Sequence, residues 1–120
     1  MRNAMRALVT SVAVSIVAAG TAAAQKKYDP GASDTEIKIG NIMPYSGPAS
    51  AYGTIGKAQA AYFRMINEQG GINGRTIRLL SRDDGYSPPK AVEQVRDLVE
   101  GEDVLAIVGQ LGTPQALAVR

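Results

Sequence analysis

The stretch EIKIGNIMPYSGP, residues 36–48, decides the fold of this 120-residue chain. It alternates between polar and apolar residues and then stays mostly apolar up to Met43, which predicts a β-strand. Turn-forming residues follow at once, and a helical pattern begins after them. The stretch VLAIVGQLGTP, residues 104–114, repeats this order of strand, turn and helix. Small ligands bind at such loops in open α/β sheets. Because neither loop carries an obvious catalytic group, both favour binding over catalysis.

A long amphipathic helix is predicted over residues 50–69. Five residues recur in it at three- and four-residue spacing and predict one buried stripe; they are Ile55, Ala58, Tyr62, Met65 and Ile66. Gly70-Gly71 ends the helix, since glycine adopts the left-handed conformation of a helix C-terminus without a steric penalty. Asn73-Gly74 then predicts a tight turn into a second strand, residues 76–83.

The remaining elements continue the alternation of strands and helices. A second helix begins at Ser87-Pro88, an N-cap residue followed by proline at the first helical position. Its apolar face consists of Ala91, Val92, Val95, Leu98 and Val99. Residues 104–108 predict a strand buried on both faces, and Thr113-Pro114 opens a third helix. The order β-α-β-α-β-α predicts an α/β fold in which helices cover both faces of a parallel sheet.

The amino terminus has the pattern of a secretory signal peptide. Arg2 and Arg6 precede a small, apolar run over residues 7–19, and three alanines ending at Ala24 supply a cleavage site. The mature chain is therefore expected to begin near Gln25. The apolar run is shorter than the roughly 20 residues that a membrane-spanning helix needs, which favours a cleaved signal over a membrane anchor.

Removal of residues 1–24 changes the charge balance. The whole chain has 13 basic and 11 acidic residues, and this segment holds two of the arginines and no acidic residue. The mature part therefore has 11 of each and a formal net charge of zero, which leaves no basic surface for nucleic acid. The next residues, 25–35, are polar and predict a flexible lead-in.

The chain contains neither cysteine nor histidine. Without cysteine it forms no disulfide and offers no site for the lipid anchor of a lipoprotein, so we expect a freely soluble protein outside the inner membrane. Without histidine it lacks the commonest general base and metal ligand, and we expect no metal and no cofactor. The third helical pattern reaches the last residue in its second turn. We therefore expect residues 36–120 to be the first part of a longer domain.

Motifs for nucleotide binding and nucleophilic catalysis are missing. The first strand is not followed by G-x-G-x-x-G. GTIGKA, residues 53–58, has neither the spacing of a phosphate loop nor its Ser/Thr. Ser46 does not lie in G-x-S-x-G, and the chain has no histidine to activate it.

Polar residues at the predicted strand ends are candidate ligand contacts. The backbone N–H groups of residues 109–113, with Leu111, Gly112 and Thr113 at their centre, precede a helix start and favour a bound carboxylate. Thr113 adds a hydroxyl group, and the alternative is that this hydroxyl caps its own helix.

Further candidates are two tyrosines that flank the first loop and two aspartates at the end of the second predicted strand. Tyr45 and Tyr52 each offer a ring and a hydroxyl to a ligand, with packing against the loop as the alternative. Asp83-Asp84 has the composition of a metal or acid–base pair, but nothing nearby completes such a site. The structural alternative is that Asp84 and Ser87 orient the second helix while Asp83 lines the edge of the cleft.

Taken in order, these residues match a known pattern. Its parts are IKIG at 37–40, SGP at 46–48, YG at 52–53, IN at 66–67, GGING at 70–74, DD at 83–84 with Pro88, and VG at 108–109. The chain resembles the periplasmic solute-binding proteins of ABC transporters, in the branched-chain amino acid (leucine-binding) family. The resemblance covers essentially all of residues 36–120.

The resemblance implies a type I periplasmic binding fold, in which two α/β lobes close over a ligand, and an incomplete amino-terminal lobe for this chain. It implies no enzyme activity, an amino acid or related carboxylate or amide as ligand, and ABC permease and ATPase subunits as partners. The ligand's polar groups would be bound by Ser46, Tyr52, Gly112 and Thr113. Some leucine-binding members have a serine-rich stretch where this chain has LGTP at 111–114, which leaves the ligand open. A ligand-sensing receptor of the same fold and an exported α/β enzyme are the alternatives.

Overall fold

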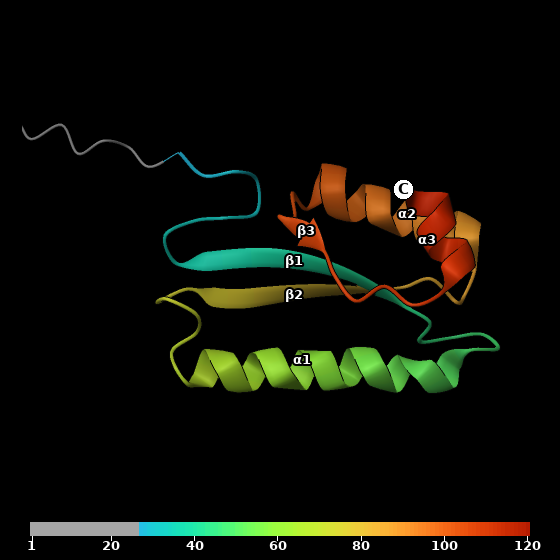
Figure 1. Ribbon diagram of the computed structural model, residues 1–120, viewed down its shortest axis with the longest axis horizontal. Helices are drawn as coiled ribbons and strands as arrows, with labels where there is room; N and C mark the ends of the chain where they lie inside the picture. The colour runs from blue at the N-terminus through green and yellow to red at the C-terminus, as the bar shows by residue number, and fades with distance from the viewer. Residues whose placement is uncertain (1–26) are drawn as a thin grey trace, which may run out of the picture.

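A computed structural model describes residues 27–120, which form a three-stranded parallel sheet with helices on both faces (Figure 1). The predicted signal peptide, residues 1–24, lies outside the described residues. The strands are β1 (Glu36–Met43), β2 (Thr76–Asp83) and β3 (Ala106–Ile107), in the spatial order β2-β1-β3. Because both strand pairs are parallel, all three carboxyl ends lie at one edge of the sheet. The predicted parallel α/β fold is confirmed.

The two strand pairs differ in length. β1 pairs with β2 over eight residues and with β3 over two. The predicted strand over residues 104–108 was therefore too long, and it is not buried on both faces, since Leu105 is 42% exposed. β3 lies at the edge of the sheet, where β1 is its one neighbour among residues 27–120. Backbone bonds from Leu105 N–H to the Lys38 carbonyl and from Val108 N–H to the Gly40 carbonyl hold its two ends.

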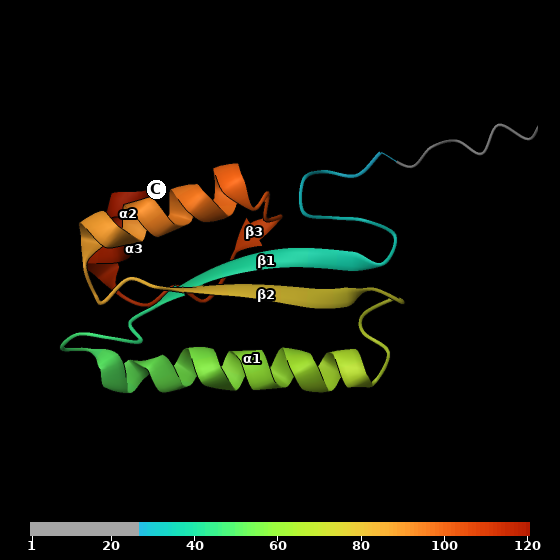
Figure 2. The same ribbon diagram turned by 180° about the vertical axis from the view of Figure 1, so that it is seen from behind.

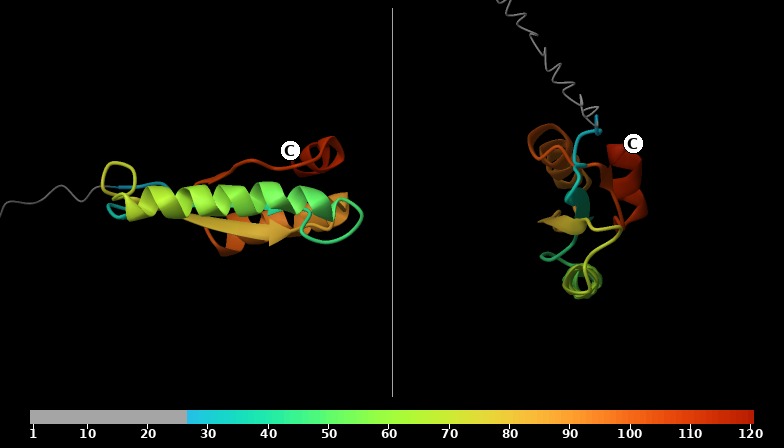
Figure 3. Two further views of the ribbon diagram at one scale, coloured as in Figure 1. Left: turned by 90° about the horizontal axis from the view of Figure 1, so that it is seen from below. Right: turned by 90° about the vertical axis from the view of Figure 1, so that its left-hand side faces the viewer.

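One helix covers the first face of the sheet and two helices cover the second (Figures 1 and 2). α1 (Gly53–Glu68) follows a 3-10 turn, η1 (Ser50–Tyr52), and packs on β2 and β1. α2 (Pro88–Arg96), its π-helical extension η2 (Asp97–Gly101) and α3 (Thr113–Val119) lie on the other face. Figure 3 shows α2 and α3 side by side there. The core between this pair and the sheet consists of Ile42, Ala91, Leu98 and Val104.

The buried face of α1 differs from the predicted stripe. Ile55, Tyr62 and Met65 are 41%, 55% and 44% exposed, Ala58 is exposed as well, and Ile66 is partly buried. The helix instead buries Gly53 and Gly56. The reason is the ring of Tyr45, since a Cβ on Gly56 would lie 2.1 Å from the Tyr45 hydroxyl oxygen. The helix approaches the sheet through residues that have no side chain, so hydrophobicity alone pointed to the wrong face.

The predicted helix ends and turns are largely confirmed. Gly70 and Gly71 have φ of +100° and +73° at the end of α1. Asn73 and Gly74 form the tight turn, which is closed by reciprocal backbone bonds between Ile72 and Arg75 of 2.8 and 3.0 Å. Ser87 is the N-cap of α2, although its side chain makes no capping bond. The prediction for Thr113 was wrong by one residue, because Gly112 is the N-cap of α3 and Thr113 is already helical.

Candidate ligand-binding site

The loops after the three strands lie together at the carboxyl edge of the sheet, at the right-hand end of β1 and β2 in Figure 1. The first and second loops touch, since a Cβ on Gly47 would lie 2.6 Å from the Gly85 carbonyl oxygen. The second and third loops touch as well, because a Cβ on Gly112 would lie 3.0 Å from the ring of Tyr86. Loops that are far apart in sequence are thereby held together.

Asp83, predicted at the cleft edge, anchors the first loop. Its carboxylate accepts the Ser46 hydroxyl at 2.6 Å and the backbone N–H groups of Tyr45, Ser46 and Gly85 at 2.9, 3.1 and 2.9 Å. It also pairs with the Lys90 ammonium at 3.3 Å. Burial opposes ionisation of this carboxyl, but the bonds from Ser46, Gly85 and Lys90 outweigh it and hold the Asp83 pKa below its usual range. The one hydroxyl hydrogen of Ser46 is donated to Asp83. The Ser46 hydroxyl can therefore only accept a hydrogen bond from a ligand.

The third loop offers backbone donors. Within residues 27–120, none of the N–H groups of residues 109–112 donates a hydrogen bond to the protein. Gly109 and Gly112 have φ of +65° and +108°, which lets the chain turn sharply on either side of Leu111. Thr113 is exposed and its hydroxyl does not cap α3. The loop therefore presents free amides and one free hydroxyl beside each other.

The two tyrosines have different surroundings. Tyr52 is 57% exposed where η1 meets α1, with its ring open to solvent. Tyr45 is partly buried, its ring lies against Gly53 and Gly56, and its hydroxyl is 2.5 Å from the Ser81 Oγ. Tyr45 therefore supports the first loop from below. Tyr52 is the aromatic residue of this pair that a ligand can reach.

Asp84 takes the structural role that the sequence suggested. It is fully buried, its Oδ1 accepts the Tyr86 N–H at 2.9 Å, and its carbonyl accepts the Ser87 N–H at 2.9 Å. These bonds hold Tyr86 at φ +61°, a conformation that aromatic residues rarely adopt. Sequence reasoning missed Tyr86 because no motif marks a left-handed tyrosine. Its position next to Gly85, in a turn after a strand, was the available signal.

A buried polar cluster beneath the loops was also missed. Asn41 of β1 is fully buried, and its side chain bonds to Gln59 of α1, Ser81 of β2 and the Gly109 carbonyl. Asn41 and Ser81 are paired in the β1–β2 register. The signal was a polar residue, Asn41, at the start of a run that is otherwise apolar up to Pro44.

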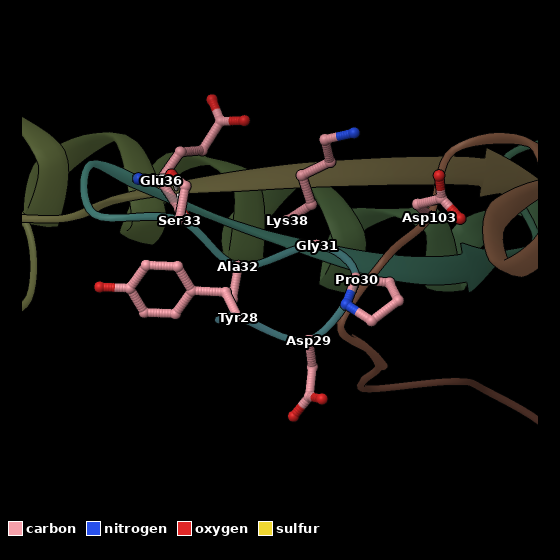
Figure 4. Close-up of a pocket in the computed structure, with 9 residues that line it drawn as sticks. All are labelled: Tyr28, Asp29, Pro30, Gly31, Ala32, Ser33, Glu36, Lys38 and Asp103. Atoms are coloured by element: carbon pink, nitrogen blue, oxygen red, sulfur yellow. Dashed lines mark hydrogen bonds between the residues drawn. The ribbon is translucent and has the colours of Figure 1, made fainter. Parts of the chain in front are cut away.

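A pocket of about 470 Å³ lies at the opposite, amino edge of the sheet, beside the lead-in. Figure 4 shows Glu36 and Lys38 pointing to one side and Asp29 to the other, so its polar groups do not converge on one point. The lead-in itself is attached to β1, because Lys38 N–H donates to the Gly31 carbonyl at 2.7 Å. Among residues 27–120 there is no acidic cluster that could hold a metal ion, and no helix has the length and apolar character needed to cross a membrane.

Known proteins resemble this chain in both sequence and structure. A family described as "Periplasmic binding protein" matches residues 36–120. Leu/Ile/Val-binding protein homolog 7 of Brucella abortus is 31% identical over 104 residues, which cover 86% of this chain and 25% of that protein.

Two solved structures extend the likeness to the fold. A fatty acid ABC transporter substrate-binding protein from Thermomonospora curvata superposes with a TM-score of 0.67 and 39% identity, over 78% of this chain and 24% of that one. The branched-chain amino acid transporter substrate-binding protein LivJ from Streptococcus pneumoniae, in complex with isoleucine, superposes with a TM-score of 0.65 and 31% identity. This match covers 71% of this chain and 25% of that one. The chain thus spans about a quarter of the length of each of these three relatives.

Proposed function

We propose that this chain, which belongs to the periplasmic binding protein family, supplies one wall of a cleft that captures a small carboxylate or amide ligand outside the inner membrane. The family resemblance drawn from the sequence and the type I periplasmic binding fold are confirmed. The observation that carries the proposal is the loop of residues 109–112, which lies at the same edge of the sheet as the other two loops and whose N–H groups donate no hydrogen bond within residues 27–120.

The proposed roles follow from what each group can donate or accept. The amides around Leu111 and Gly112, with the Thr113 hydroxyl, bind the ligand's carboxylate, because N–H and O–H donors form their strongest bonds to charged oxygens. Ser46 accepts a hydrogen bond from a ligand nitrogen, since its own hydrogen is bound to Asp83. Tyr52 packs its exposed ring along the ligand. None of these roles needs a nucleophile, a metal or a cofactor, and we propose no catalytic activity.

The relatives narrow the ligand class. One carries a Leu/Ile/Val-binding name, one is in complex with isoleucine, and one is named for fatty acids. The chemistry shared by these ligands is a carboxylate, which matches the free amides of the third loop. We propose that the ligand is delivered to a permease driven by ATPase subunits, with the protein located in the periplasm after removal of its signal peptide.

A melting experiment on the full-length protein tests this function. L-Isoleucine and decanoate are added separately at millimolar concentration, because a ligand that binds only the folded state raises Tm. We expect at least one of them to raise Tm. We expect the methyl ester of the active compound, which lacks the carboxylate charge, to have no effect. No shift with either compound, or an equal shift with the ester, would contradict the proposal.

A further inference from the structure

We propose that Asn41 is a positioning residue for the ligand loop, holding the Gly109 carbonyl inward so that the next N–H faces the cleft. This inference rests on the proposed function, because it assigns a cause to the orientation of the proposed ligand donors. The Asn41 Nδ2 lies 3.4 Å from the Gly109 carbonyl oxygen. In a planar trans peptide the C=O and the following N–H point in opposite directions. A carbonyl held toward Asn41 therefore turns the N–H of Gln110 away from the protein interior.

The hydrogen atoms in this cluster can be assigned from the bonds themselves. Ser81 Oγ donates to Asn41 Oδ1 at 2.6 Å, so its hydrogen is used there. The Tyr45 hydroxyl, 2.5 Å from the same Oγ, must then be the donor of that second bond. The chain of bonds runs from Tyr45 to Ser81 to Asn41, and each bond polarises the next.

Asn41 ends this chain by donating twice. One Nδ2 hydrogen bonds to Gln59 Oε1 at 2.7 Å, and the other faces the Gly109 carbonyl. A carbonyl oxygen can only accept a hydrogen bond, which fixes the amide of Asn41 in this orientation. An amide turned by a half-rotation would set the Asn41 oxygen against the Gly109 carbonyl oxygen and leave that carbonyl without its donor.

Gln59 also holds Gly109 in place. A Cβ on Gly109 would lie 2.4 Å from Gln59 Nε2, so the side-chain amide of Gln59 packs directly against the backbone of Gly109. The φ of +65° at Gly109 also favours glycine. The loop thus leaves the sheet at a residue whose carbonyl, Cα and backbone conformation are all held by α1 and β1.

The position of Asn41 explains why one side chain can bond to three different elements. β1 is the middle strand, so a residue near its carboxyl end lies between the ends of β2 and β3 and beneath α1. Asn41 reaches β2 through Ser81, α1 through Gln59 and the β3 loop through Gly109. No other side chain among residues 27–120 bonds to all three of these elements.

Asn67 is a matched control within the same helix–sheet layer. Its Nδ2 donates to the Ile77 carbonyl at 2.8 Å, and its Oδ1 accepts the Ile77 N–H at 2.8 Å. It is a partly buried asparagine between α1 and β2, as firmly bonded as Asn41, but it lies at the amino edge of the sheet. Its loss disturbs packing without touching the third loop.

The test compares Asn41→Asp with Asn67→Asp in the full-length protein. Each change keeps the size of the side chain and replaces its donor by an oxygen. In Asn41→Asp, Gln59 can turn its side-chain amide and donate to the new carboxylate. The Gly109 carbonyl can only accept, so it cannot bond to that carboxylate. The first readout is the NMR order parameter of the backbone N–H groups of residues 110–112 without ligand. We expect values near 0.85 in the wild type and below about 0.6 in Asn41→Asp, with no change in Asn67→Asp.

The second readout is the affinity for whichever of L-isoleucine and decanoate stabilises the wild type. Loss of the loop geometry should weaken binding about tenfold in Asn41→Asp and less than about twofold in Asn67→Asp. Equal losses in the two variants would overturn the positioning role, because general destabilisation would then explain both. Unchanged order parameters in Asn41→Asp would overturn it as well.

A second variant covers the case in which Asn41→Asp does not fold. Gln59→Leu removes one partner of Asn41 and the amide beneath Gly109, and it should lower the order parameters of residues 110–112. If it leaves them unchanged, the proposal fails. The two hypotheses remain separable, because a wild type that binds neither compound refutes the proposed function, while the ligand-free order parameters still decide the role of Asn41.

Discussion

The two edges of the sheet use polar side chains differently. At the amino edge, Asn67 and Ser33 each bond to one short backbone segment: Asn67 bonds to Ile77, and Ser33 Oγ accepts the N–H groups of Thr35 and Glu36. At the carboxyl edge, Asp83 and Asn41 each bond to partners from several elements, up to 68 residues away. Bonds of the first kind complete single turns and strand starts. Bonds of the second kind fix several loops relative to one another, which is what a binding surface requires.

The largest difference between the edges is expected at two glycines with nearly equal φ. Gly112 at the carboxyl edge has φ +108°, and a Cβ there would lie 2.0 Å from the Oε1 of buried Gln115. Gly70 at the amino edge has φ +100° and nothing within 4 Å. Backbone strain is common to both, so Gly70→Ala should lower the free energy of unfolding by about 1 kcal/mol. Gly112→Ala should lower it by about 3 kcal/mol, because overpacking adds to the strain.

Urea denaturation of both glycine variants checks this prediction. Equal losses would mean that Gln115 moves aside freely, and the third loop would then be less tightly packed than the proposed site requires. Gly112→Ala should also weaken ligand binding, whereas Gly70→Ala should not.

The second prediction concerns the charge at the carboxyl edge. Asp83→Asn should lower the free energy of unfolding by about 2 kcal/mol at pH 7, because hydrogen bonds to a charged acceptor are lost. The Asp83 pKa is depressed in the folded protein, so its contribution is complete above the unfolded pKa of about 3.9. It is lost as the pH falls from there toward the folded pKa. The difference between wild type and variant should therefore shrink below about pH 4.

Asp103→Asn is the control for this charge. Asp103 is an exposed carboxylate at the amino edge, at φ +53°, where asparagine is also tolerated. It should change stability by less than about 0.5 kcal/mol. A pH-independent loss in Asp83→Asn would show that the loop depends on the shape of the side chain and not on its charge.

The third prediction compares the ligand affinities of variants at the two edges of the sheet. Thr113→Ala and Tyr52→Ala should each weaken ligand affinity about tenfold without unfolding the protein, because each removes one contact from an exposed side chain. Thr76→Ala at the amino edge, which removes a hydroxyl bond to the Thr35 carbonyl, should leave affinity unchanged. Calorimetric titration measures all three, and unchanged affinity in both carboxyl-edge variants would refute the site assignment.

The smallest effects distinguish two serines. Ser33 makes three bonds with neighbouring backbone, so Ser33→Ala should lower the free energy of unfolding by about 1 kcal/mol. Ser87 is an N-cap residue whose side chain makes no capping bond, and the two prolines that follow it leave only the third helical residue with an N–H group that could be capped. Ser87→Ala should change stability by less than about 0.5 kcal/mol, below the usual value for a cap. A loss of about 1 kcal/mol on thermal unfolding would show that a capping bond forms in solution.

The fold was predictable because it depends on local signals. The apolar alternation of residues 36–43, the glycines at 70–71 and the Asn-Gly turn each determine backbone conformation within a few residues. The buried face of α1 was not predictable, because it depends on the ring of Tyr45 meeting Gly56 from another element. The length of β3 was not predictable either, because it depends on how many neighbouring strands β3 pairs with.

The candidate site was predictable only as a set of loops. The positions of Ser46, Asp83 and Gly112 at strand ends follow from the order of elements, and the parallel sheet brings their loops together. That Ser46 donates to Asp83, or that Asn41 faces Gly109, depends on distances between elements far apart in sequence. Such contacts leave no periodic signal, and a lone asparagine in a strand is the most that the sequence shows.

The unequal pairing of β1 has a consequence for the order of folding. β1, α1 and β2 form a unit joined by eight paired residues, whereas β3 is attached by two. Contacts close in sequence form first and those that close long loops form later, so we expect β3 to dock last. The donors of residues 109–112 then reach the other loops in the last step that joins these three strands. A ligand that binds them is therefore recognised only after β3 has docked on β1.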